Sequence, residues 1–448
     1  RDTKISYCNL DNNTASGGGI RHGGGAIKVF GNHTIISNCN FTNGVAFAGS
    51  GGALDIGGDN ASVYYSWFDN NDACYNGGAI NWDGGHGSDS IIGCTFTNNN
   101  CNYSQQGGGA VFWTAGEIGN IGSGGLIEDS IFINNTASQK HGGAVNWYHA
   151  KDSVINNCLF INNTASSDGG ALYTGHQTGG GFNLTMTNCQ FYNNTAHKHG
   201  GAIANQMESS YIYNNTFDGN RAQASGGSIL MKEGFADNSV IDHCYIYNSY
   251  IDQNYEGNTQ YGVGGAAIRI GGATTENDDN ITISNCAIIN STANKTWGGA
   301  IYIDGKSEGT SLINVTIQNV RVLDGYGGAI TWKGNKGTMN NVTIFNSSAT
   351  IVDDVNAYST NDKSANGGAI YLSGSNCNLT DIRIFESSTN KNNKSSIKSN
   401  NGGAVYVSGS SNTITNIEID DSYALSEKMD AKGGAIYWSG SLDRKSVV

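Results

Sequence analysis

The chain has 448 residues, a charged fraction of only 14% and a formal net charge of −13. This acidic balance argues against a nucleic-acid groove or an anionic membrane surface as partner. No window holds the roughly 18 consecutive apolar residues that a membrane-spanning helix needs. The chain contains no proline, which indicates a backbone paired almost everywhere, because proline cannot donate to a strand ladder. The composition is uniform, so we expect one domain over residues 1–448.

A short phrase recurs along the whole chain. Fourteen Gly-Gly pairs, each followed by Ala or Ser, recur along the chain at spacings of 26 to 40 residues, a period typical of solenoids. Between successive pairs lies a landmark residue, an apolar residue that closes a strand, as in NCNF ending at Phe41 and NCLF ending at Phe160. The pairs begin at Gly24, Gly51, Gly77, Gly108, Gly142, Gly169, Gly200, Gly226, Gly264, Gly298, Gly327, Gly367, Gly402 and Gly433.

The segments after the glycine pairs predict strands from the first repeat to the last. GGALDIGG (51–58) and GGAIYIDG (298–305) alternate with a period of two, which indicates one buried face. Strands that stack repeat on repeat predict an all-β fold, a right-handed parallel β-helix of about 14 coils. Landmark phenylalanines should fill its interior, and corner asparagines should stack as a hydrogen-bonded ladder. Longer connections follow Ile246, Ile344 and Ile384 in the C-terminal half.

Aromatic residues fall on both faces of the predicted strands. Trp82, Trp113 and Trp147 share the inward parity of their neighbours, so we expect a stack in the core. An outward row offers a stacking surface for sugar rings or a stripe for protein contact, although tyrosine also simply suits an exposed strand. This candidate binding face consists of Tyr302, Tyr371, Tyr406 and Tyr437, with Thr331 in the gap of the row.

Cysteines and asparagines supply the remaining candidates. Seven cysteines share the slot two residues before the landmark, where other coils have Ser, Asn, Val or Ile, so we expect small buried thiols there. Cys74 and Cys101 lie in the turns of adjacent coils and are a disulfide candidate, which would imply an oxidising compartment. The candidate glycosylation sites, chosen among many Asn-x-Ser/Thr sequences, are Asn134, Asn162, Asn193 and Asn294.

The repeat also carries a family resemblance. GGA followed by Ile, Leu or Val, alternating with Phe-x-x-Asn, resembles the repeat pair of the polymorphic outer membrane protein family of bacterial surface adhesins. The Asn-, Thr- and Ile-rich variant is similar to the adhesin-like β-helix proteins of methanogenic archaea. After Phe217 the landmark becomes Ile and Phe-x-x-Asn fades. We expect no C-terminal translocation barrel in this chain, so the family's outer-membrane anchoring is not carried over. The motifs stand as GGAI (77–80), GGAV (142–145), GGAL (169–172), FINN (132–135, 160–163) and FYNN (191–194).

Together these features predict an extracellular, adhesin-like rod of the cell surface that binds a glycan or protein of a host or neighbouring cell. We expect no catalytic residue, metal or other cofactor. Both termini fall inside a coil, so we expect a segment of a longer β-helix that continues end to end. One alternative is a polysaccharide lyase or hydrolase, although the paired acids, such as Asp420–Asp421, fall in separate connections. A further alternative is a structural fibre.

Overall fold

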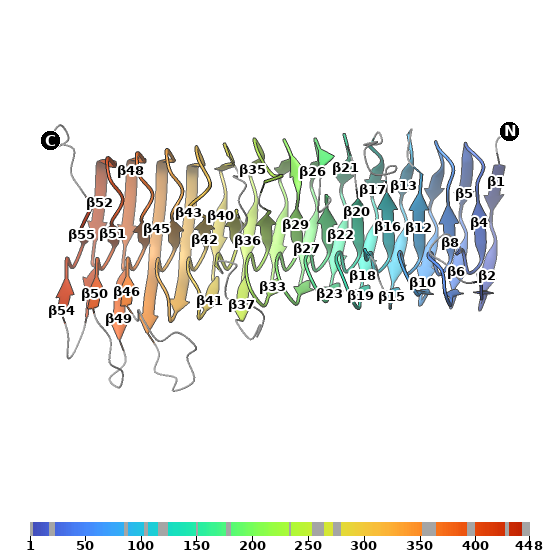
Figure 1. Ribbon diagram of the computed structural model, residues 1–448, viewed down its shortest axis with the longest axis horizontal. Coiled ribbons are helices and arrows are strands. Elements are labelled where there is room, and N and C mark those ends of the chain that lie inside the picture. Colours follow the sequence, from blue (N-terminus) through green and yellow to red (C-terminus); the bar gives the residue numbers. More distant parts are fainter. Residues whose placement is uncertain are drawn as a thin grey trace. The chain divides into compact units, whose positions relative to one another are not determined.

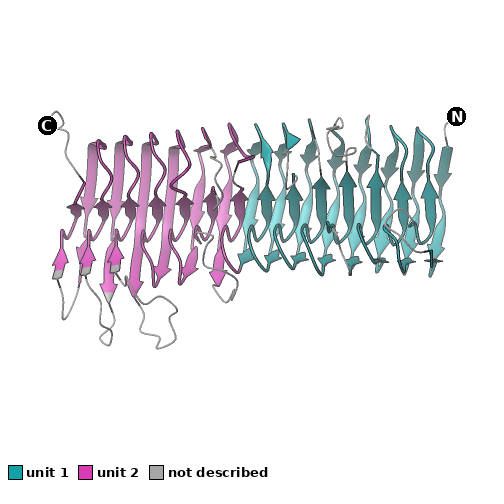
Figure 2. Cartoon of the chain, viewed as in Figure 1, with its two compact units in different colours: residues 1–222 teal, residues 223–448 magenta. Residues whose placement is uncertain are grey.

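In the computed structural model, strands are the regular elements of the described residues, and none of those residues forms a helix long and apolar enough to span a membrane. The chain divides into two compact units, unit 1 (residues 1–222) and unit 2 (residues 223–448), coloured separately in Figure 2. Within each unit, strands of successive coils lie side by side in chain order (Figure 1). The structure describes residues 3–17, 23–84, 88–102, 106–114, 124–148, 151–175, 181–232, 234–252, 264–271, 279–351, 364–391, 399–425 and 430–440.

Unit 1 is a parallel β-helix, as the sequence predicts. The strands that follow the glycine pairs form one sheet, and the landmark strands belong to another. Within each of these sheets, the strands of successive coils are hydrogen-bonded in parallel. The glycine-pair strands are β4 (Ile27–Val29), β8 (Leu54–Ile56), β12 (Ile80–Asp83), β16 (Val111–Thr114), β20 (Val145–Tyr148), β24 (Leu172–Thr174) and β29 (Ile203–Asn205). The landmark strands are β2 (Asn9–Asp11), β6 (Asn40–Thr42), β10 (Trp67–Asp69), β14 (Thr95–Thr97), β18 (Ile131–Ile133), β22 (Leu159–Ile161), β27 (Gln190–Tyr192) and β32 (Thr216–Asp218).

A column of phenylalanine rings fills the interior of unit 1. Each ring is fully buried and lies in register with the landmark of the next coil. Neighbouring ring centroids are 4.7 to 4.9 Å apart and the planes differ by 1° to 7°, so each ring stacks on the next. The column consists of Phe41, Phe68, Phe96, Phe132, Phe160, Phe191 and Phe217. The predicted tryptophan stack is also confirmed, because Trp82, Trp113 and Trp147 are buried with centroids 4.5 and 4.7 Å apart.

The predicted asparagine ladder runs beside the phenylalanine column. The Nδ2 of Asn135 donates to Asn163 Oδ1 at 3.0 Å and to the Phe96 carbonyl at 3.1 Å. Its Oδ1 accepts the Nδ2 and the backbone N–H of Asn99 at 2.9 and 3.1 Å. Every polar atom of this buried amide is therefore satisfied, which is the condition for burying it without penalty. The ladder consists of Asn71, Asn99, Asn135, Asn163, Asn194 and Asn220.

The two glycines of each pair serve different purposes. Gly142 has a φ of +66°, a left-handed conformation that side chains disfavour. A Cβ on Gly143 would lie 2.0 Å from the carbonyl oxygen of Gly170 in the next coil, so the second glycine is required by close approach of the coils. The pair beginning at Gly264 is shifted by one residue from the sequence-based alignment. There Gly265 takes the left-handed position, with a φ of +70°, and Ala266 follows it.

Unit 2 repeats the same parallel coil with different contents. Its landmark residues are isoleucines, including the buried Ile344 and Ile384, in place of phenylalanine rings. The glycine-pair strands are β34 (Ile229–Met231), β38 (Ile268–Ile270), β42 (Ile301–Ile303), β44 (Ile330–Trp332), β47 (Ile370–Leu372), β51 (Val405–Val407) and β55 (Ile436–Trp438). The landmark strands are β36 (Tyr245–Tyr247), β40 (Ala287–Ile289), β43 (Ser311–Leu323), β45 (Thr338–Ile351), β48 (Asn378–Phe385) and β52 (Thr413–Asp420).

Serines replace the ladder asparagines in most coils of unit 2. The buried hydroxyls of Ser347 and Ser387 lie 2.9 Å apart and form a short polar contact where unit 1 has two amides. The long connections predicted after Ile246, Ile344 and Ile384 fall largely on residues 253–263, 352–363 and 392–398, which lie outside the described residues.

Candidate ligand-binding face

Five aromatic rings of unit 2 stack into one column on the outward side of the glycine-pair sheet. Its centroids are 5.9, 5.1, 5.0 and 5.4 Å apart in order, with planes inclined by 3° to 24°. All five side chains are half-buried. Because the ring faces are turned toward one another, the column offers ring edges and phenol hydroxyls to a ligand more than open faces. This aromatic column consists of Trp297, Tyr326, Tyr371, Tyr406 and Tyr437.

Tyr302 differs from the predicted exposed row, because its side chain is only 1% exposed. Trp297, which directly precedes a glycine pair, lies over it with ring centroids 6.0 Å apart. Thr331 is buried as well, and its hydroxyl donates to the carbonyl of Tyr326 at 2.9 Å. Tyr326 rather than Thr331 therefore fills the gap in the row. The residue before the glycine pair folds over the outward face of the strand, an effect that strand periodicity alone does not reveal.

Three charged residues gather beside the Trp297 end of the aromatic column. Arg269, at the centre of β38, is 2% exposed, and its Nη2 lies 3.7 Å from Asp304 Oδ2. Its Nε donates to the Gly271 carbonyl at 2.8 Å, and its guanidinium lies 5.1 Å from the centroid of the Tyr302 ring. The buried Nη1 has no hydrogen-bond partner. The arginine is held on one side by carbonyl, carboxylate and ring, and its hydrogen-bonding capacity is not used up.

Lys333 supplies the second positive charge of this group. It directly follows β44 and places its ammonium 3.5 Å from the centroid of the Trp297 ring and 5.5 Å from that of Tyr302. Burial lowers the pKa of the Lys333 ammonium to about 8; the positive charge of Arg269 adds to this lowering, and Asp304 opposes it. Burial likewise raises the pKa of the Tyr302 hydroxyl, which stays protonated at neutral pH. The group therefore holds two cations against one carboxylate.

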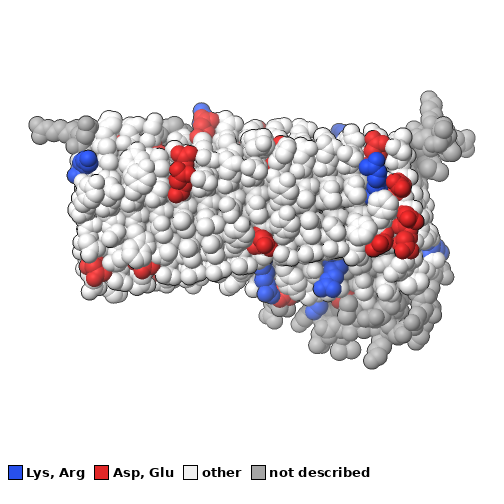
Figure 3. Space-filling view, turned by 180° about the vertical axis from the view of Figure 1, so that it is seen from behind, with Lys and Arg blue, Asp and Glu red and all other residues white. Residues whose placement is uncertain are grey.

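Charged residues make up only 14% of the chain. Figure 3 shows a face on which most of the area is uncharged, with acidic and basic residues in small separate groups. The whole chain holds 24 Lys and Arg against 37 Asp and Glu. The local excess of positive charge, two cations beside one carboxylate, is therefore opposite in sign to the net charge of the chain.

The disulfide candidate is not brought together. β11 (Asp72–Ala73) pairs with β15 (Asn100–Cys101) so that Ala73, not Cys74, lies opposite Cys101. Cys101 is buried, whereas Cys74 comes one residue after its coil's aligned position, and a one-residue offset in a strand turns a side chain to the other face. Both residues are present as thiols.

The shared cysteine slot is polar as well as buried. Six of its seven cysteines are buried as expected, and Cys8 is half-buried. The backbone N–H of Cys39 donates to Ser66 Oγ at 3.1 Å, and that of Cys189 donates to Asn215 Oδ1 at 2.7 Å. In these coils the slot thus provides an acceptor to the preceding coil, which explains why cysteine alternates there with serine and asparagine.

The glycosylation candidates lie at the corners or in a strand. Asn134, Asn162 and Asn193 are exposed and adopt φ values of 54° to 56°, so they turn the corner after the landmark strand. The Nδ2 of Asn134 donates to Asn98 Oδ1 at 3.4 Å. Asn294, the last residue of β41 (Thr292–Asn294), is half-buried. Attachment of sugars at these four residues remains a prediction.

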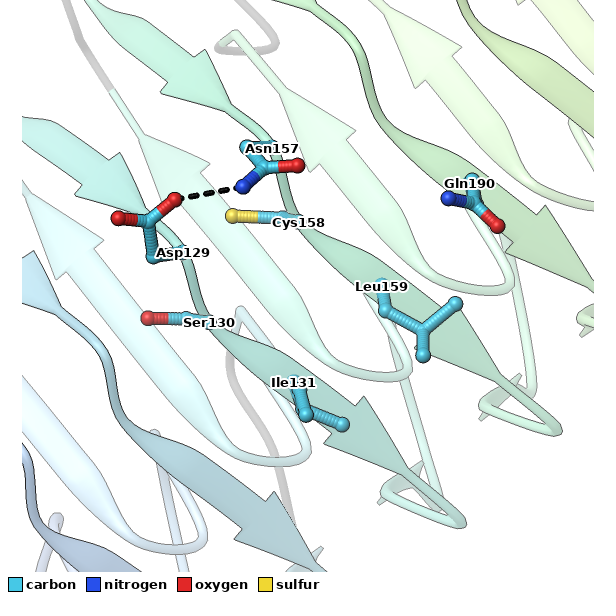
Figure 4. A pocket seen from close by; sticks show the side chains of 7 residues that line it. All are labelled: Asp129, Ser130, Ile131, Asn157, Cys158, Leu159 and Gln190. Carbon is cyan, nitrogen blue, oxygen red and sulfur yellow. Dashed lines mark hydrogen bonds between the residues drawn. The ribbon is translucent and has the colours of Figure 1, made fainter.

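A small hollow opens on unit 1, and Figure 4 shows the side chains that line it. It has a volume of about 480 Å³, and Asn157 Nδ2 donates to Asp129 Oδ1 across it at 2.7 Å. The lining holds a single carboxylate, Asp129, and burial raises the pKa of the Cys158 thiol well above its usual value. A thiol kept protonated is a poor nucleophile. The lining residues are Asp129, Ser130, Ile131, Asn157, Cys158, Leu159 and Gln190.

Metal-ligating side chains do not gather in the part of the chain that the structure describes: no three His, Cys, Asp or Glu residues there could hold an ion together. Of the paired acids weighed as catalytic carboxylates, Asp420 ends β52 and Asp421 follows it with a φ of 46°. Their neighbour across the ladder is Phe385, which pairs with Asp420. In the preceding coil Glu386 takes the same corner position as Asp421, with a φ of 52°, and its backbone N–H donates to the Asp420 carbonyl at 3.2 Å, so one further acidic residue lies beside this pair.

Comparison with known proteins gives one family match. Residues 157–175 and 188–206 match the model of the Chlamydia polymorphic membrane protein repeat. Each range starts at the asparagine before a slot cysteine and runs through the landmark phenylalanine, the corner asparagines and the glycine pair. Comparison with curated proteins found no match to this sequence.

Solved structures with a similar backbone include three enzymes of alginate chemistry. A PL6 alginate lyase complexed with a trisaccharide is 12% identical, with a TM-score of 0.50 over 100% of this chain and 91% of its own. An alginate lyase complexed with G6 is 13% identical (TM-score 0.49; 86% and 79% covered), and a periplasmic alginate epimerase is 12% identical (TM-score 0.42; 87% and 78% covered). At 12% identity, the likeness to the first lyase shows a shared fold and nothing about activity. The other two structures, with TM-scores below 0.5, are too dissimilar to support a conclusion. The protein is a parallel β-helix that carries repeats of the polymorphic membrane protein type.

Proposed function

We propose that this protein is a non-enzymatic, adhesin-like component of the cell surface, whose coils present the aromatic column to a glycan or protein of a host or neighbouring cell. The repeat match supports the surface location, because the matched model describes a membrane protein family. The observation that carries the binding role is the aromatic column itself. Five half-buried rings on neighbouring coils form one continuous strip of apolar edge and hydroxyl.

The spacing of the column suits a ligand that repeats along its length. Successive tyrosine rings are 5.0 to 5.4 Å apart, because each tyrosine follows the strand spacing of the sheet. A ligand with regularly repeated rings and hydroxyls, as in an extended glycan, meets the same edge and the same phenol donor at each step. Aromatic side chains are also the residues most often enriched at protein interfaces, so a protein partner fits the same strip.

A glycan array tests this function with variants chosen for exposure. The test protein carries Tyr371→Ala and Tyr406→Ala, two half-buried members of the aromatic column, and leaves the buried Tyr302 intact because its removal would damage packing. The matched control is Tyr245→Ala, an exposed tyrosine of β36 on the other sheet of the same unit, with 46% exposure. We expect binding of at least one glycan class that falls by 10-fold or more in the test protein and not in the control.

The same samples separate binding from catalysis. We expect bound glycans to be recovered at their original length after prolonged incubation, as chromatography of the released ligand would show. Shortened or unsaturated products would overturn the non-enzymatic proposal. Binding that survives in the double variant would place recognition elsewhere on the molecule. If no glycan binds, a screen of surface proteins with the same two variants decides whether the aromatic column is a protein contact.

A further inference from the structure

The Trp297 end of the aromatic column has a distinct chemistry, because two cations, Lys333 and Arg269, contact aromatic rings there. The ammonium of Lys333 lies against the Trp297 ring, and its contacts among the described residues are ring faces rather than carboxylates. A lysine ammonium that is partly removed from bulk solvent usually forms a salt bridge or keeps bound water, since an unpaired buried charge is costly. Lys333 has exchanged part of its hydration for an aromatic face, and it forms no salt bridge with a carboxylate among the described residues, although the negative charge of Asp304 still favours its charged form.

The neighbouring arginine is in a similar position. Arg269 comes from β38, two strands before β44, and the two cations approach the same ring, Tyr302, at 5.1 and 5.5 Å. Asp304 is the one carboxylate paired with Arg269, at a distance of 3.7 Å. With the buried Nη1 of Arg269 unpartnered, the cluster lacks one negative charge and at least one hydrogen-bond acceptor. Both deficits are filled by one group, an anion with several oxygen atoms.

We propose that Lys333 and Arg269 form a subsite for the anionic group of an acidic glycan, a carboxylate or a sulfate ester, whose sugar rings continue along the aromatic column. This inference rests on the proposed function, and it names the ligand class. The anionic group provides the direct ion pair that Lys333 does not form with a carboxylate among the described residues, and its oxygen atoms face the donors of the cluster. Trp297 joins the two parts of the site, since it contacts the Lys333 ammonium at one end and stacks with Tyr326 of the column at the other.

The subsite gives the column a direction and a selectivity that the tyrosines alone do not. A neutral glycan contacts the ring edges equally in several registers. An acidic residue places one end of the chain at Lys333 and fixes the register of the sugars that follow. The positive charge that Asp304 leaves uncompensated also repels cationic ligands in an otherwise acidic protein, so the preference for anions does not follow from the net charge of −13.

Isothermal titration with matched oligosaccharides tests the proposal. The ligands are a neutral, a uronate-containing and a sulfated oligosaccharide of equal length, together with inorganic sulfate. The test variant is Lys333→Met, which keeps an unbranched chain against Trp297. The control is Lys336→Met. Lys336 lies three residues after Lys333, is exposed, and pairs with Glu308 at 2.7 Å. We expect one or both acidic ligands to bind wild type about 10-fold more tightly than the neutral one, about 1.4 kcal/mol. Lys333→Met should lose this advantage and Lys336→Met should keep it.

The outcomes separate this inference from the proposed function. If wild type binds neutral and acidic ligands equally, the anionic subsite is wrong and the glycan-binding face stands. If no oligosaccharide binds, both the subsite and the glycan-binding form of the proposed function are wrong. A preference for only uronate or only sulfate identifies the source of the anion. Inorganic sulfate binding that Lys333→Met leaves unchanged would show an unrelated anion site and overturn the assignment to Lys333.

A second readout does not depend on affinity. Titration of the Lys333 ammonium by nuclear magnetic resonance should give a pKa of about 8 in the free protein, moving toward the ordinary lysine value when the acidic ligand is bound, because a counter-ion favours the charged form. A pKa that does not move in the presence of saturating acidic ligand would overturn the contact between Lys333 and the anion.

Discussion

The two units of the chain use the same coil but place their longest columns of stacked rings differently, inside the coil in unit 1 and on its outer face in unit 2. Unit 1 stacks seven phenylalanines inside the coil and runs a ladder of amides beside them. Unit 2 fills the same interior with isoleucine, replaces most of the amides with serine, and stacks its rings on the outside of the glycine-pair sheet. Stacked rings inside a coil contribute to stability, whereas stacked rings at its surface are available to a partner. The candidate binding face is therefore in unit 2 even though the family repeat matches in unit 1.

The largest effect that sharpens this comparison is expected inside unit 1. Phe132→Ala should lower the free energy of unfolding of unit 1 by about 3–5 kcal/mol, because it opens a cavity and removes two stacked contacts. Ile344→Ala at the equivalent place in unit 2 should cost about 2–3 kcal/mol. Amide hydrogen exchange reads each unit separately. Phe30→Ala, at a side chain 75% exposed, is the control and should change little. Equal losses at Phe132 and Ile344 would mean that the rings act only by their volume.

The amide ladder provides the second contrast. Asn135→Ala removes four hydrogen bonds and leaves the buried backbone N–H of Asn99 without its acceptor, while Asn163 Oδ1 keeps only the Asn135 backbone N–H, so we expect a loss of about 3 kcal/mol. Ser347→Ala in unit 2 removes one contact, to the Ser387 hydroxyl, and should cost about 1 kcal/mol. Chemical denaturation, with hydrogen exchange as the probe of each unit, measures the stability lost in both variants. A similar cost for the two changes would show that the ladder orders the corner without stabilising it.

The β-helix coil could be predicted from the sequence because its residues recur periodically. Glycine pairs, landmark residues and corner asparagines recur from coil to coil, and each kind lies where it was predicted, except that the pair at Gly264 is shifted by one residue. The inward parity of Trp113 and the ladder role of Asn135 follow from the same regularity. Features that depend on one coil folding over another were out of reach. Trp297 covers Tyr302 from a turn, so the alternation of a strand assigns Tyr302 to the surface when it is buried.

The candidate site shows the same division. Three of the four tyrosines in the predicted row do stack together at the surface, and repeat position alone brings them together. Cys74 and Cys101 also lie in adjacent coils, but a register difference of one residue separates them, and register is not visible in turns of unequal length. Arg269, Asp304 and Lys333 come from three coils and share no motif. Arg269 and Lys333 lie near each other only because their side chains, which start from different coils, both extend to the Tyr302 ring.

The smallest expected effect distinguishes a functional lysine from a structural one. The pKa of Lys333 is about 8 in the folded protein and 10.5 when unperturbed, so between these values the folded state binds fewer protons than the unfolded state. The free energy of unfolding of wild type should therefore rise as the pH rises from 8 to 10.5, and below pH 8 the charged lysine destabilises unit 2. Lys333→Met removes this cost and should be more stable at pH 7 by about 1 kcal/mol, after allowing for solvent screening and the lost contact with Trp297. Thermal unfolding at pH 7 and pH 10.5 measures the difference, which should shrink at the higher pH, while Lys336→Met should show no such gain. A variant less stable than wild type at pH 7 would mean that Lys333 is retained for packing, whereas a gain in stability joined to a loss of acidic-ligand binding is what a residue kept for recognition should show.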